Sequence, residues 1–498
     1  MVLKMTHNWR RYILWFAQEH VDFRQAEFNS LVKLFNIEYR KISPDSLNPF
    51  WIVDFPNDSS ALKIASRSIG LRAIFELWSH GNNYQTFHNQ LRNYVQDNKE
   101  AVEGYFKKDC SFKITVETYN KHFTHKEKIE KIETMDYLPL EGNVDLKTPQ
   151  VEWWYIEFWG LDPTQVPEQP EDILFGRWLC DGQRHLIKEM SLKKRKFIGN
   201  TSMDAQLSLL MANQALVKPG DLIFDPFVGT GSLLVSAAKF GGYVMGADID
   251  FMMLHARARP SRITQKVREK DESIRANLKQ YGCDDRYMDV VVADFSNPLW
   301  TDSLEFDSII TDPPYGIRES TEKVETKTNM KQTSKNQDVP HYPSTSHYAL
   351  QHLYKDLLVF AAKHLTLGGR LVCWLPFHRD DYTDKMIPRH SNLHLIANSE
   401  QPLSGHTARR LLTYEKHSEP SVDHNGVEVI VDESLTLDFR ERYFDNALES
   451  RTERRLRKAE LREIGRLEAL KRGKIITDGR EKKCNINKAR FSNTNNEK

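Results

Sequence analysis

The segment Ile309–Ser320, IITDPPYGIRES, combines residue types that could hold an aromatic amine. The carboxylate of Asp312 and the backbone carbonyl of Pro313 are hydrogen-bond acceptors, and Pro313 and Pro314 have fixed φ angles and no N–H groups. Tyr315 adds an aromatic ring that could stack on a planar base. An amine held in this way can turn its nitrogen lone pair out of conjugation and attack a methyl sulfonium in line. The segment favours methyl transfer to an amino group, although the tetrapeptide alone would equally fit a proline-rich turn.

A glycine-rich turn lies upstream of this segment, in Asp225–Leu234, DPFVGTGSLL. Gly229 and Gly231 allow a tight turn and a close approach of the backbone to a ligand. Many α/β proteins need glycine at such a turn, so the motif is weak evidence when it is taken alone. No G-K-[S/T] sequence follows, so the lysine that binds the phosphates of a triphosphate is missing. The turn therefore predicts a ligand other than a nucleoside triphosphate.

Three carboxylates end successive apolar segments around this turn: Asp225, Asp248 and Asp294. Asp248 is placed to accept hydrogen bonds from both hydroxyls of a ribose. Asp294 could accept a hydrogen bond from an adenine amine, and Phe295 could pack on the adenine ring. Each acid taken alone could equally be a helix cap, but the three together indicate a nucleoside cofactor that lacks phosphate. NAD would use the same turn and ribose acid, but hydride transfer has no use for the acceptor array at Asp312.

The elements that position these residues alternate regularly from about Asp221 onward. Short apolar segments separated by helix-compatible stretches predict a parallel sheet covered on both faces, in a Rossmann-like α/β domain. Such a sheet binds its ligand beyond the carboxyl ends of its strands, where the residues named above fall. Two later segments, 392–403 and 409–416, have no long helix between them and predict a terminal antiparallel hairpin. The expected parallel strands are 221–227, 243–249, 289–295, 307–313 and 370–376.

The N-terminal part intersperses strands and helices in a way that is typical of small α+β modules. Apolar residues at helical spacing predict a helix over 22–35, and a second helix is expected over 59–78. The expected strands are 10–17, 50–55 and 151–160. We therefore expect an α+β region in front of the Rossmann-like domain.

Basic residues are clustered locally, although the 498-residue chain has a net charge of only +1. One run could bind RNA phosphates, because phosphate binding depends on the local patch and not on the total charge. Taken alone, such a run could also be a solvated face. Its members are Lys193, Lys194, Arg195 and Lys196.

The five cysteines are far apart and form no C-x-x-C pair, which predicts neither a zinc site nor a disulfide framework in this chain. A reduced, cytoplasmic compartment is the expected location. No apolar run reaches the length of a membrane-spanning segment, and the first residues lack the apolar core of a signal peptide. No membrane partner is therefore expected.

The segments described above resemble those of amino-group methyltransferases that use S-adenosylmethionine. More narrowly, the chain resembles the catalytic subunits of eukaryotic tRNA guanosine-10 N2-methyltransferases, and the resemblance extends from Arg10 to Lys416. RKFIGNTSMDA (195–205) and TDPPYGIRE (311–319) are its most specific segments. The others are FDPFVGTGS (224–232), GADID (246–250) and ADF (293–295).

The resemblance implies a fold, a cofactor and partners that the spacing of residues does not. It implies a ferredoxin-like module and a THUMP domain in the N-terminal part, with S-adenosylmethionine as cofactor and tRNA as substrate. The expected product is N2-methylguanosine at position 10, made in a heterodimer with a small zinc-binding activator that covers an apolar sheet edge. Thr201 and Ser202 are expected over the methionine end of the cofactor. With Asp204 they could also cap the next helix, and both interpretations can hold. Phe227 is expected in the cofactor loop.

The pattern and the resemblance together give an expected domain organisation. Its parts are a ferredoxin-like plus THUMP region (1–160), a linker and cofactor-covering segment (161–205), a Rossmann-like methyltransferase domain (206–425) with a polar, disordered insertion (321–346), and a basic, partly helical tail (426–498). Two alternatives stay open. One is another nucleic-acid amino methyltransferase, acting on rRNA guanine N2 or DNA adenine N6. The other is a catalytically silent tRNA-binding subunit, which the intact Asp312–Tyr315 segment argues against.

Overall fold

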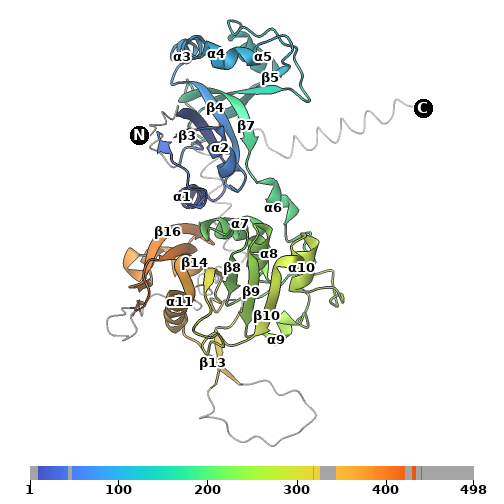
Figure 1. Ribbon diagram of the computed structural model, residues 1–498, viewed down its shortest axis with the longest axis vertical. Coiled ribbons are helices and arrows are strands. Elements are labelled where there is room, and N and C mark those ends of the chain that lie inside the picture. Colours follow the sequence, from blue (N-terminus) through green and yellow to red (C-terminus); the bar gives the residue numbers. More distant parts are fainter. Residues whose placement is uncertain are drawn as a thin grey trace, which may run out of the picture. The chain divides into compact units, whose positions relative to one another are not determined.

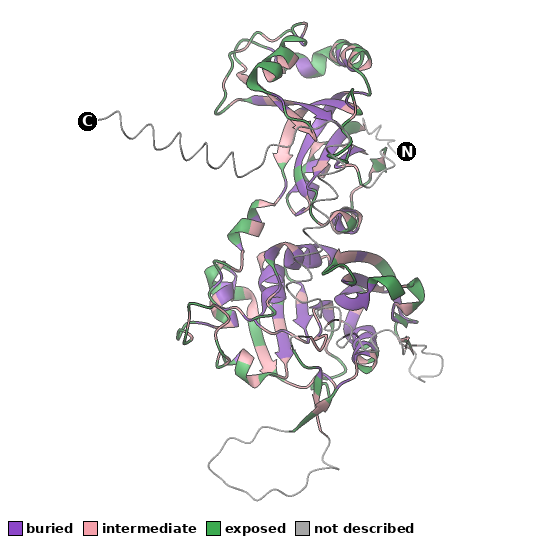
Figure 2. Ribbon diagram, turned by 180° about the vertical axis from the view of Figure 1, so that it is seen from behind, coloured by how far each residue is buried: buried purple, intermediate pink, exposed green. Residues whose placement is uncertain are grey.

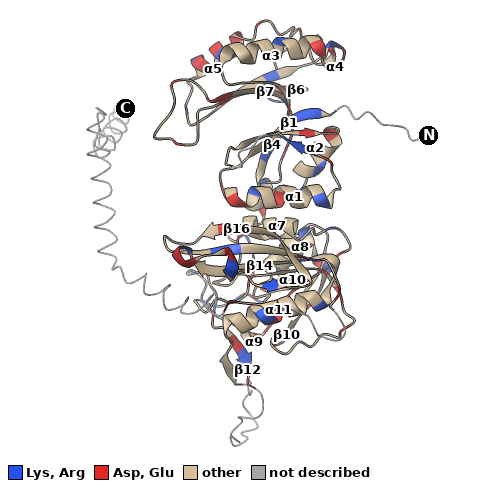
Figure 3. Cartoon of the chain, turned by 90° about the vertical axis from the view of Figure 1, so that its left-hand side faces the viewer, with Lys and Arg blue, Asp and Glu red and all other residues tan. Residues whose placement is uncertain are grey.

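The computed structural model describes residues 9–42, 47–317, 319–325, 344–420, 429–432, 439 and 443. Two large sheets organise these residues, one in the N-terminal part and one in the C-terminal part (Figure 1). The central strands of both sheets are buried (Figure 2). Basic and acidic positions are interspersed along helices such as α1 and α11 (Figure 3), in keeping with the small net charge. No helix in these ranges is long and apolar enough to cross a membrane.

The N-terminal sheet has the strand order β2-β3-β1-β4-β7-β6-β5. Neighbouring strands are antiparallel, except β5 and β6, which are parallel. Its strands are β1 (Arg10–Phe16), β2 (Arg40–Lys41), β3 (Phe50–Phe55), β4 (Leu71–Gly81), β5 (Phe112–Tyr119), β6 (Val151–Phe158) and β7 (Asp172–Asp181). Its α-helices are α1 (Arg24–Leu34), α2 (Asp58–Ala65), α3 (Tyr84–Asp97), α4 (Lys99–Val102) and α5 (His125–Glu133).

The N-terminal sheet continues past residue 160, where the sequence analysis places the end of this region. β7 begins at Asp172 and lies between β4 and β6, so it is a central strand and not a linker. Its segment, DILFGRWLCD, carries no regular alternation, so the sequence pattern does not predict a strand there. The helix α6 (His185–Glu189) follows and leads toward the C-terminal sheet.

Residues 59–78 form a helix followed by a strand, so the prediction of a single helix is wrong. α2 ends at Ala65 and β4 begins at Leu71. The buried carboxylate of Glu27 holds the break between them, because it accepts hydrogen bonds from the backbone N–H groups of Ile69 (2.7 Å) and Gly70 (2.9 Å). A short apolar run such as the one in β4 does not distinguish a buried strand from a helix.

The C-terminal sheet has the strand order β10-β9-β8-β11-β14-β17-β16-β15-β18. The strands from β10 to β14 are parallel to one another, which confirms the predicted Rossmann-like sheet. β16 and β17 pair antiparallel, which confirms the predicted hairpin, and β17 also pairs antiparallel with β14. Apolar side chains of α7, α8 and α10 pack on one face of the sheet, and those of α11 pack on the other.

The bounds of these elements agree closely with the apolar segments of the sequence. The strands are β8 (Leu222–Asp225), β9 (Tyr243–Asp248), β10 (Tyr287–Val292), β11 (Phe306–Thr311), β14 (Leu365–His378), β15 (Arg389–His390), β16 (Leu393–Pro402), β17 (Thr407–Lys416) and β18 (Val429–Ile430). The α-helices are α7 (Ala205–Gln214), α8 (Ser232–Lys239), α9 (Phe251–Leu254), α10 (Ile274–Gln280) and α11 (Leu350–His364).

The two ends of the polar insertion 321–346 are ordered, which the sequence analysis did not expect. β12 (Glu322–Val324) pairs antiparallel with β13 (Thr345–His347), because backbone hydrogen bonds can form a ladder without an apolar core. Residues 326–343 lie outside the described residues, as does the tail from residue 444 onward.

A polar joint connects α1 with the helix and strands of the C-terminal sheet. Glu27 on α1 is 1% exposed and accepts a hydrogen bond from the side-chain amide of Asn213 on α7 (2.8 Å). Arg370 on β14 donates to the Ser30 hydroxyl at 3.0 Å, and Lys33 on α1 pairs with Glu415. Because buried polar groups are expensive to leave without a partner, Glu27 is the member of this joint that stabilises the fold most.

Replacement of Glu27 tests this joint. In Glu27→Ala, the N–H groups of Ile69 and Gly70 and the amide of Asn213 lose a buried acceptor, so we expect a loss of about 3 kcal/mol in the free energy of unfolding. Urea denaturation measures it. The matched control is Lys33→Ala on the same helix, whose exposed ion pair contributes less than about 1 kcal/mol. A loss for Glu27→Ala no larger than that of the control would contradict the assignment.

Candidate active site

A cavity of about 720 Å³ opens where the parallel strands of the C-terminal sheet end. Loops after β8, β9, β10 and β11 line it, together with residues of β12 and β13. A volume of this size is typical of sites for small ligands and cofactors. The predicted site residues that line the cavity are Phe227, Asp248, Asp294, Phe295, Asp312 and Pro314.

The glycine turn after β8 is built for a close approach of the backbone. Gly229 and Gly231 have φ angles of +49° and +73°, a region that glycine adopts without strain. A Cβ atom at Gly229 would meet nothing within 4 Å, whereas one at Gly231 would lie 2.6 Å from the side chain of Ile274. Gly229 therefore faces open space in which a ligand fits, and Gly231 allows α10 to pack against the turn.

Asp248 at the end of β9 supports the glycine turn and also faces the cavity. Its carboxylate accepts hydrogen bonds from the N–H groups of Gly229 (2.8 Å) and Asp250 (2.9 Å). Burial raises the pKa of Asp248 to about 6, and these two hydrogen bonds act in the opposite direction. A carboxylate can accept about four hydrogen bonds, so Asp248 can still accept from hydroxyl groups of a ligand.

Asp294, which follows β10, also combines backbone contacts with a position on the cavity. Its carboxylate accepts hydrogen bonds from the N–H groups of Ser296 (2.9 Å) and Val324 (2.7 Å). Val324 belongs to β12, so an end of the insertion is attached directly to this part of the site. The ring of Phe295 packs against that of Phe227, with centroids 5.0 Å apart. An acidic acceptor beside two aromatic rings fits an adenine base.

Asp225 lies behind the cavity and does not line it. It is 2% exposed, and its carboxylate accepts hydrogen bonds from the Thr311 hydroxyl (2.8 Å) and the Phe227 N–H (3.1 Å). Burial raises the pKa of Asp225 to about 8, and the charges of Asp248 and Asp312 act in the same direction. The sequence predicts a cofactor contact for Asp225. In the structure, its carboxylate instead joins the ends of β8 and β11.

Asp312 directly follows β11 and has two charged or polar partners. The Tyr315 hydroxyl donates a hydrogen bond to one of its oxygens, and Arg409 on β17 donates to the other at 3.2 Å. Burial raises the pKa of Asp312, whereas the charge of Arg409 lowers it. Pro313 is buried behind this carboxylate, and Pro314 faces the cavity. The four residues of the predicted array, Asp312 to Tyr315, therefore lie together directly after the carboxyl end of β11.

Arg409 is the residue of this site that the sequence analysis did not single out. Its side chain is 12% exposed and lies over the ring of Trp374, 4.0 Å from the ring centroid. The one available signal was a pair of arginines, Arg409 and Arg410, directly before Leu411 and Leu412 in the same strand. A charged residue in a buried strand needs a partner, and here Asp312 is that partner.

Thr201 and Ser202 lie beside the cavity lining rather than in it. The Ser202 hydroxyl is 2.6 Å from the hydroxyl of Thr230 in the glycine turn, and Thr201 donates a hydrogen bond to Glu319. Glu319 itself lines the cavity. The helix cap of α7 is Asp204, whose carboxylate accepts from the N–H of Leu207 at 3.0 Å. Of the three predicted capping candidates, Asp204 is therefore confirmed, whereas Thr201 and Ser202 do not cap the helix.

The basic run before this segment is divided between surface and core. Lys193 and Lys194 are exposed, whereas Arg195 is 0% exposed and donates hydrogen bonds to the Ser232 hydroxyl (2.9 Å) and the Met190 carbonyl (3.1 Å). The prediction that Arg195 binds RNA is wrong, because a fully buried guanidinium cannot reach a phosphate.

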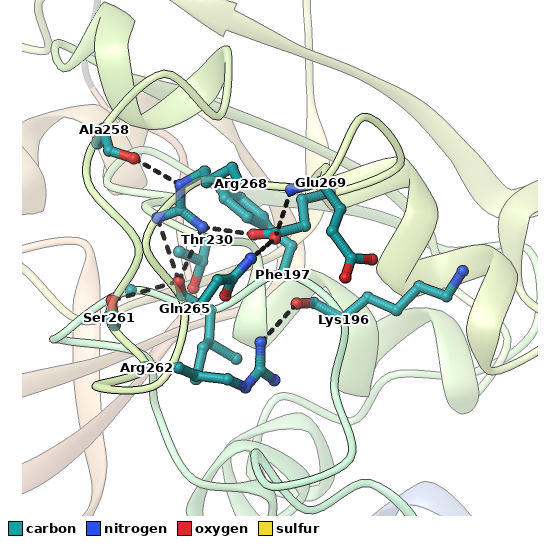
Figure 4. A network of polar contacts seen from close by, with 12 residues as sticks. Lys196, Phe197, Thr230, Ala258, Ser261, Arg262, Gln265, Arg268 and Glu269 are labelled. Atoms are coloured by element: carbon teal, nitrogen blue, oxygen red, sulfur yellow. Dashed lines mark hydrogen bonds and ion pairs between the residues drawn. The ribbon is translucent and has the colours of Figure 1, made fainter.

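The loop after α9 packs against the end of this basic run (Figure 4). Arg262 donates to the backbone carbonyl of Lys196 at 3.0 Å, and Arg268 donates to that of Ile198 at 3.4 Å. The ammonium of Lys196 pairs with Asp271 on the surface. These arginines hold the backbone of the segment that precedes Thr201, so they support the site from outside.

Comparison with known proteins then gives the family. Residues 10–184 match the THUMP N-terminal domain model named Tmrp11, and residues 193–335 match the RMKL-like methyltransferase domain model. The tRNA (guanine(10)-N(2))-methyltransferase TRMT11 of Gallus gallus is 46% identical over 411 residues, which cover 82% of this chain and 88% of that protein. The chain belongs to the tRNA (guanine(10)-N(2))-methyltransferase family.

Other members of the tRNA (guanine(10)-N(2))-methyltransferase family are similar over the same length. The human TRMT11 protein is 45% identical over 452 residues, which cover 89% of this chain and 96% of that protein. The Saccharomyces cerevisiae protein is 35% identical and covers 88% of this chain and 99% of its own. Among solved structures, and apart from these family members, a crystal structure of TrmN from Thermus thermophilus covers 82% of this chain and 99% of its own, at 17% identity and a TM-score of 0.39.

The stability of the site should depend on pH through Asp225. Its pKa of about 8 lies above the ordinary value of 3.8, so the folded protein binds this proton more tightly than the unfolded chain does. The stability that the protonated Asp225 contributes is fully present below the ordinary pKa of 3.8, and it is lost as the pH rises through the folded-state pKa of about 8. Asp225→Asn keeps an acceptor for Thr311 and Phe227 but carries no charge. We expect the variant to gain stability relative to wild type between pH of about 4 and about 8.

Thermal unfolding midpoints of both proteins, measured across that pH range, check this expectation. The difference between the two midpoints should grow with pH and then level off. A constant difference would mean that the Asp225 carboxylate is ionised in the folded protein throughout the range.

Proposed function

We propose that this chain transfers the methyl group of S-adenosylmethionine to the exocyclic N2 amine of guanosine 10 in tRNA. The observation that carries the proposal is the location of Asp312, which follows a strand end and lines the same cavity as Asp248 and Asp294. Relatives that are 45–46% identical to this chain bear the name of that activity. The acceptor for an amine and the acceptors for a nucleoside therefore meet at one edge of the sheet.

The chain's own residues would orient the amine and stabilise charge. Asp312 and the backbone carbonyl of Pro313 accept the two hydrogens of the amine, and the ring of Tyr315 stacks on the guanine. Positive charge develops on the nitrogen as the new bond forms, so a fixed carboxylate stabilises the transition state more than the ground state. A strong base is not required, because the amine becomes acidic only when it has been methylated.

The cavity would hold the nucleoside part of the cofactor. Asp248 accepts from the ribose hydroxyls and Asp294 from the adenine amine, while Phe227 and Phe295 pack on the adenine. The segment 201–202 would close the cavity at the methionine end. When bound, S-adenosylmethionine supplies an electrophilic methyl group on a cationic sulfur. The carboxylates around the cavity suit a ligand that carries positive charge.

A small zinc-binding activator subunit would cover the edge of the C-terminal sheet. β10 is an edge strand of that sheet, and it exposes the apolar side chain of Met288 (55%). An edge strand presents unpaired backbone groups that another chain can extend, and exposed apolar side chains favour such pairing. The edge of β10 is therefore the surface that best fits the activator.

The RNA would be held by the THUMP-containing half and by a basic hollow of about 560 Å³ beside α6, in which Glu19, the one acid of the lining, pairs with Arg184. The hollow brings Lys188 of α6 together with Lys193 and Lys194, and all three are exposed. None of the three forms an ion pair with any residue that the structure describes. Unpaired ammonium groups in a hollow suit backbone phosphates, which position RNA without reading its sequence. Such contacts would help to repay the few kcal/mol needed to flip a base out of its stack.

Methyl transfer by the assembled enzyme tests the proposed function. The chain is purified with its activator and incubated with methyl donor and tRNA carrying either guanosine or adenosine at position 10. Nucleoside mass spectrometry should detect N2-methylguanosine only with guanosine. Asp312→Ala should lower the rate by at least about 10²-fold, because it removes the charge-stabilising acceptor.

The matched control is Asp307→Asn, at the opposite end of the same strand, where the side chain accepts a hydrogen bond from the Leu222 N–H. It should methylate at the wild-type rate. An unchanged rate in Asp312→Ala would favour the silent tRNA-binding subunit. Methylation of rRNA or DNA adenine, without methylation of tRNA, would favour another nucleic-acid amino methyltransferase.

The basic hollow makes a separate prediction about RNA affinity. A Lys193→Ala and Lys194→Ala double variant should bind tRNA more weakly, and the salt dependence of log K should fall by about one to two units of slope. Filter binding over a series of salt concentrations measures both. Lys196→Ala is the control, since its charge is already paired with Asp271, and it should change the slope less. An unchanged slope in the double variant would remove these lysines from the RNA surface.

A further inference from the structure

Arg409 contacts the carboxylate that the proposed reaction depends on, although it lies 97 positions away in the chain. One of its terminal nitrogens is 3.2 Å from an oxygen of Asp312 and 3.4 Å from the hydroxyl of Tyr315. Asp312 has a side chain that is 22% exposed, so this is a partly buried ion pair at the mouth of the cavity. A charge pair in such a place is stronger than one on the open surface.

Arg409 is held by contacts that do not involve Asp312. Its Nε donates to the side chain of Gln401 on β16 at 2.7 Å, and its second terminal nitrogen lies 3.4 Å from the sulfur of Met203. Its guanidinium also lies over the ring of Trp374 on β14. Three separate elements therefore fix the guanidinium before any substrate enters. Tyr315, in contrast, lies in the same turn as Asp312 itself, and its hydroxyl bonds to Asp312 and Arg409.

We propose that Arg409 is the positioning residue that keeps Asp312 ionised and correctly oriented for the target amine. When a base enters, Tyr315 gives up its hydrogen bond and stacks on the ring, whereas Arg409 stays on the carboxylate. One side of the Asp312 carboxylate thereby accepts hydrogen bonds from the amine, and the other side accepts from the Arg409 guanidinium. This inference rests on the proposed function, since it assigns a role within the same site.

The surroundings of Asp312 explain why a cation is needed there. Burial raises the pKa of Asp312, while the charge of Arg409 and the hydrogen bond from Tyr315 lower it. The other titratable groups that face Asp312 are Asp225 beyond β8, Glu319 in the next loop, Tyr354 on α11 and Cys373 on β14. His20 faces Arg409 from the N-terminal part. Arg409 is the cation among these groups that touches the carboxylate.

The test is the pH dependence of single-turnover methylation by the assembled enzyme. The ionised form of Asp312 is the active form, so activity should rise with pH along an acidic limb. In Arg409→Gln the limb should move to higher pH by about one unit or more, because a cation within 4 Å lowers a carboxylate pKa by one to three units. The rate near neutral pH should fall on the order of 10²-fold and should recover partly as the pH is raised.

Arg409→Lys keeps the charge without the two-pronged geometry, so its limb should stay near the wild-type position while its maximal rate falls. The control is Arg410→Gln on the other face of the same strand, where the arginine pairs with Glu400. It should leave the limb in place. Thermal unfolding and binding of the methyl donor show that each variant is folded.

An acidic limb of Arg409→Gln that coincides with those of wild type and Arg410→Gln would overturn the positioning role. That outcome differs from failure of the proposed function, in which the wild-type complex itself would transfer no methyl group to tRNA. A uniform loss at every pH in Arg409→Gln, with an unmoved limb, would likewise reduce Arg409 to a structural residue.

Discussion

The hydrogen bond from the Thr311 hydroxyl to the Asp225 carboxylate joins the ends of two neighbouring parallel strands, and the rest of the site depends on that junction. β8 leads into the glycine turn and β11 leads into Asp312. Their pairing, with Ile309 opposite Phe224, makes the two strands end at the same level. A shift of one residue would turn the side chains of β11 to the opposite face of the sheet, so the register itself places Asp312 at the cavity.

The electrostatic character of the cavity follows from this arrangement. Carboxylates that end adjacent strands raise one another's pKa, as Asp248 and Asp312 do for Asp225. Such a field favours a cationic ligand and disfavours the phosphates of RNA. Three exposed lysines, Lys188, Lys193 and Lys194, lie instead in a hollow beside α6, and the half-buried Arg409 offsets the charge at Asp312. The molecule thus separates the surface that suits a polyanion from the cavity that suits a positively charged methyl donor.

The sequence was most informative where function depends on strand ends. Alternating apolar segments predicted the parallel sheet, and the positions of Asp248 and Asp312 followed from them, because strand ends in such a sheet share one edge. Properties that depend on distant residues were not predictable. Arg409 reaches the site from an antiparallel strand, and nothing local marks its partner. Arg195 has the same sequence neighbours as the exposed lysines beside it, so the run of charges could not show that Arg195 is buried.

The central claim is that methylation of the guanosine 10 amine requires this chain. The most direct measurement is nucleoside mass spectrometry of tRNA fragments containing position 10, taken from cells that lack the chain. The account predicts that N2-methylguanosine at that position disappears and returns when the wild-type chain is restored. Undiminished N2-methylguanosine at position 10 in the cells without the chain would contradict it.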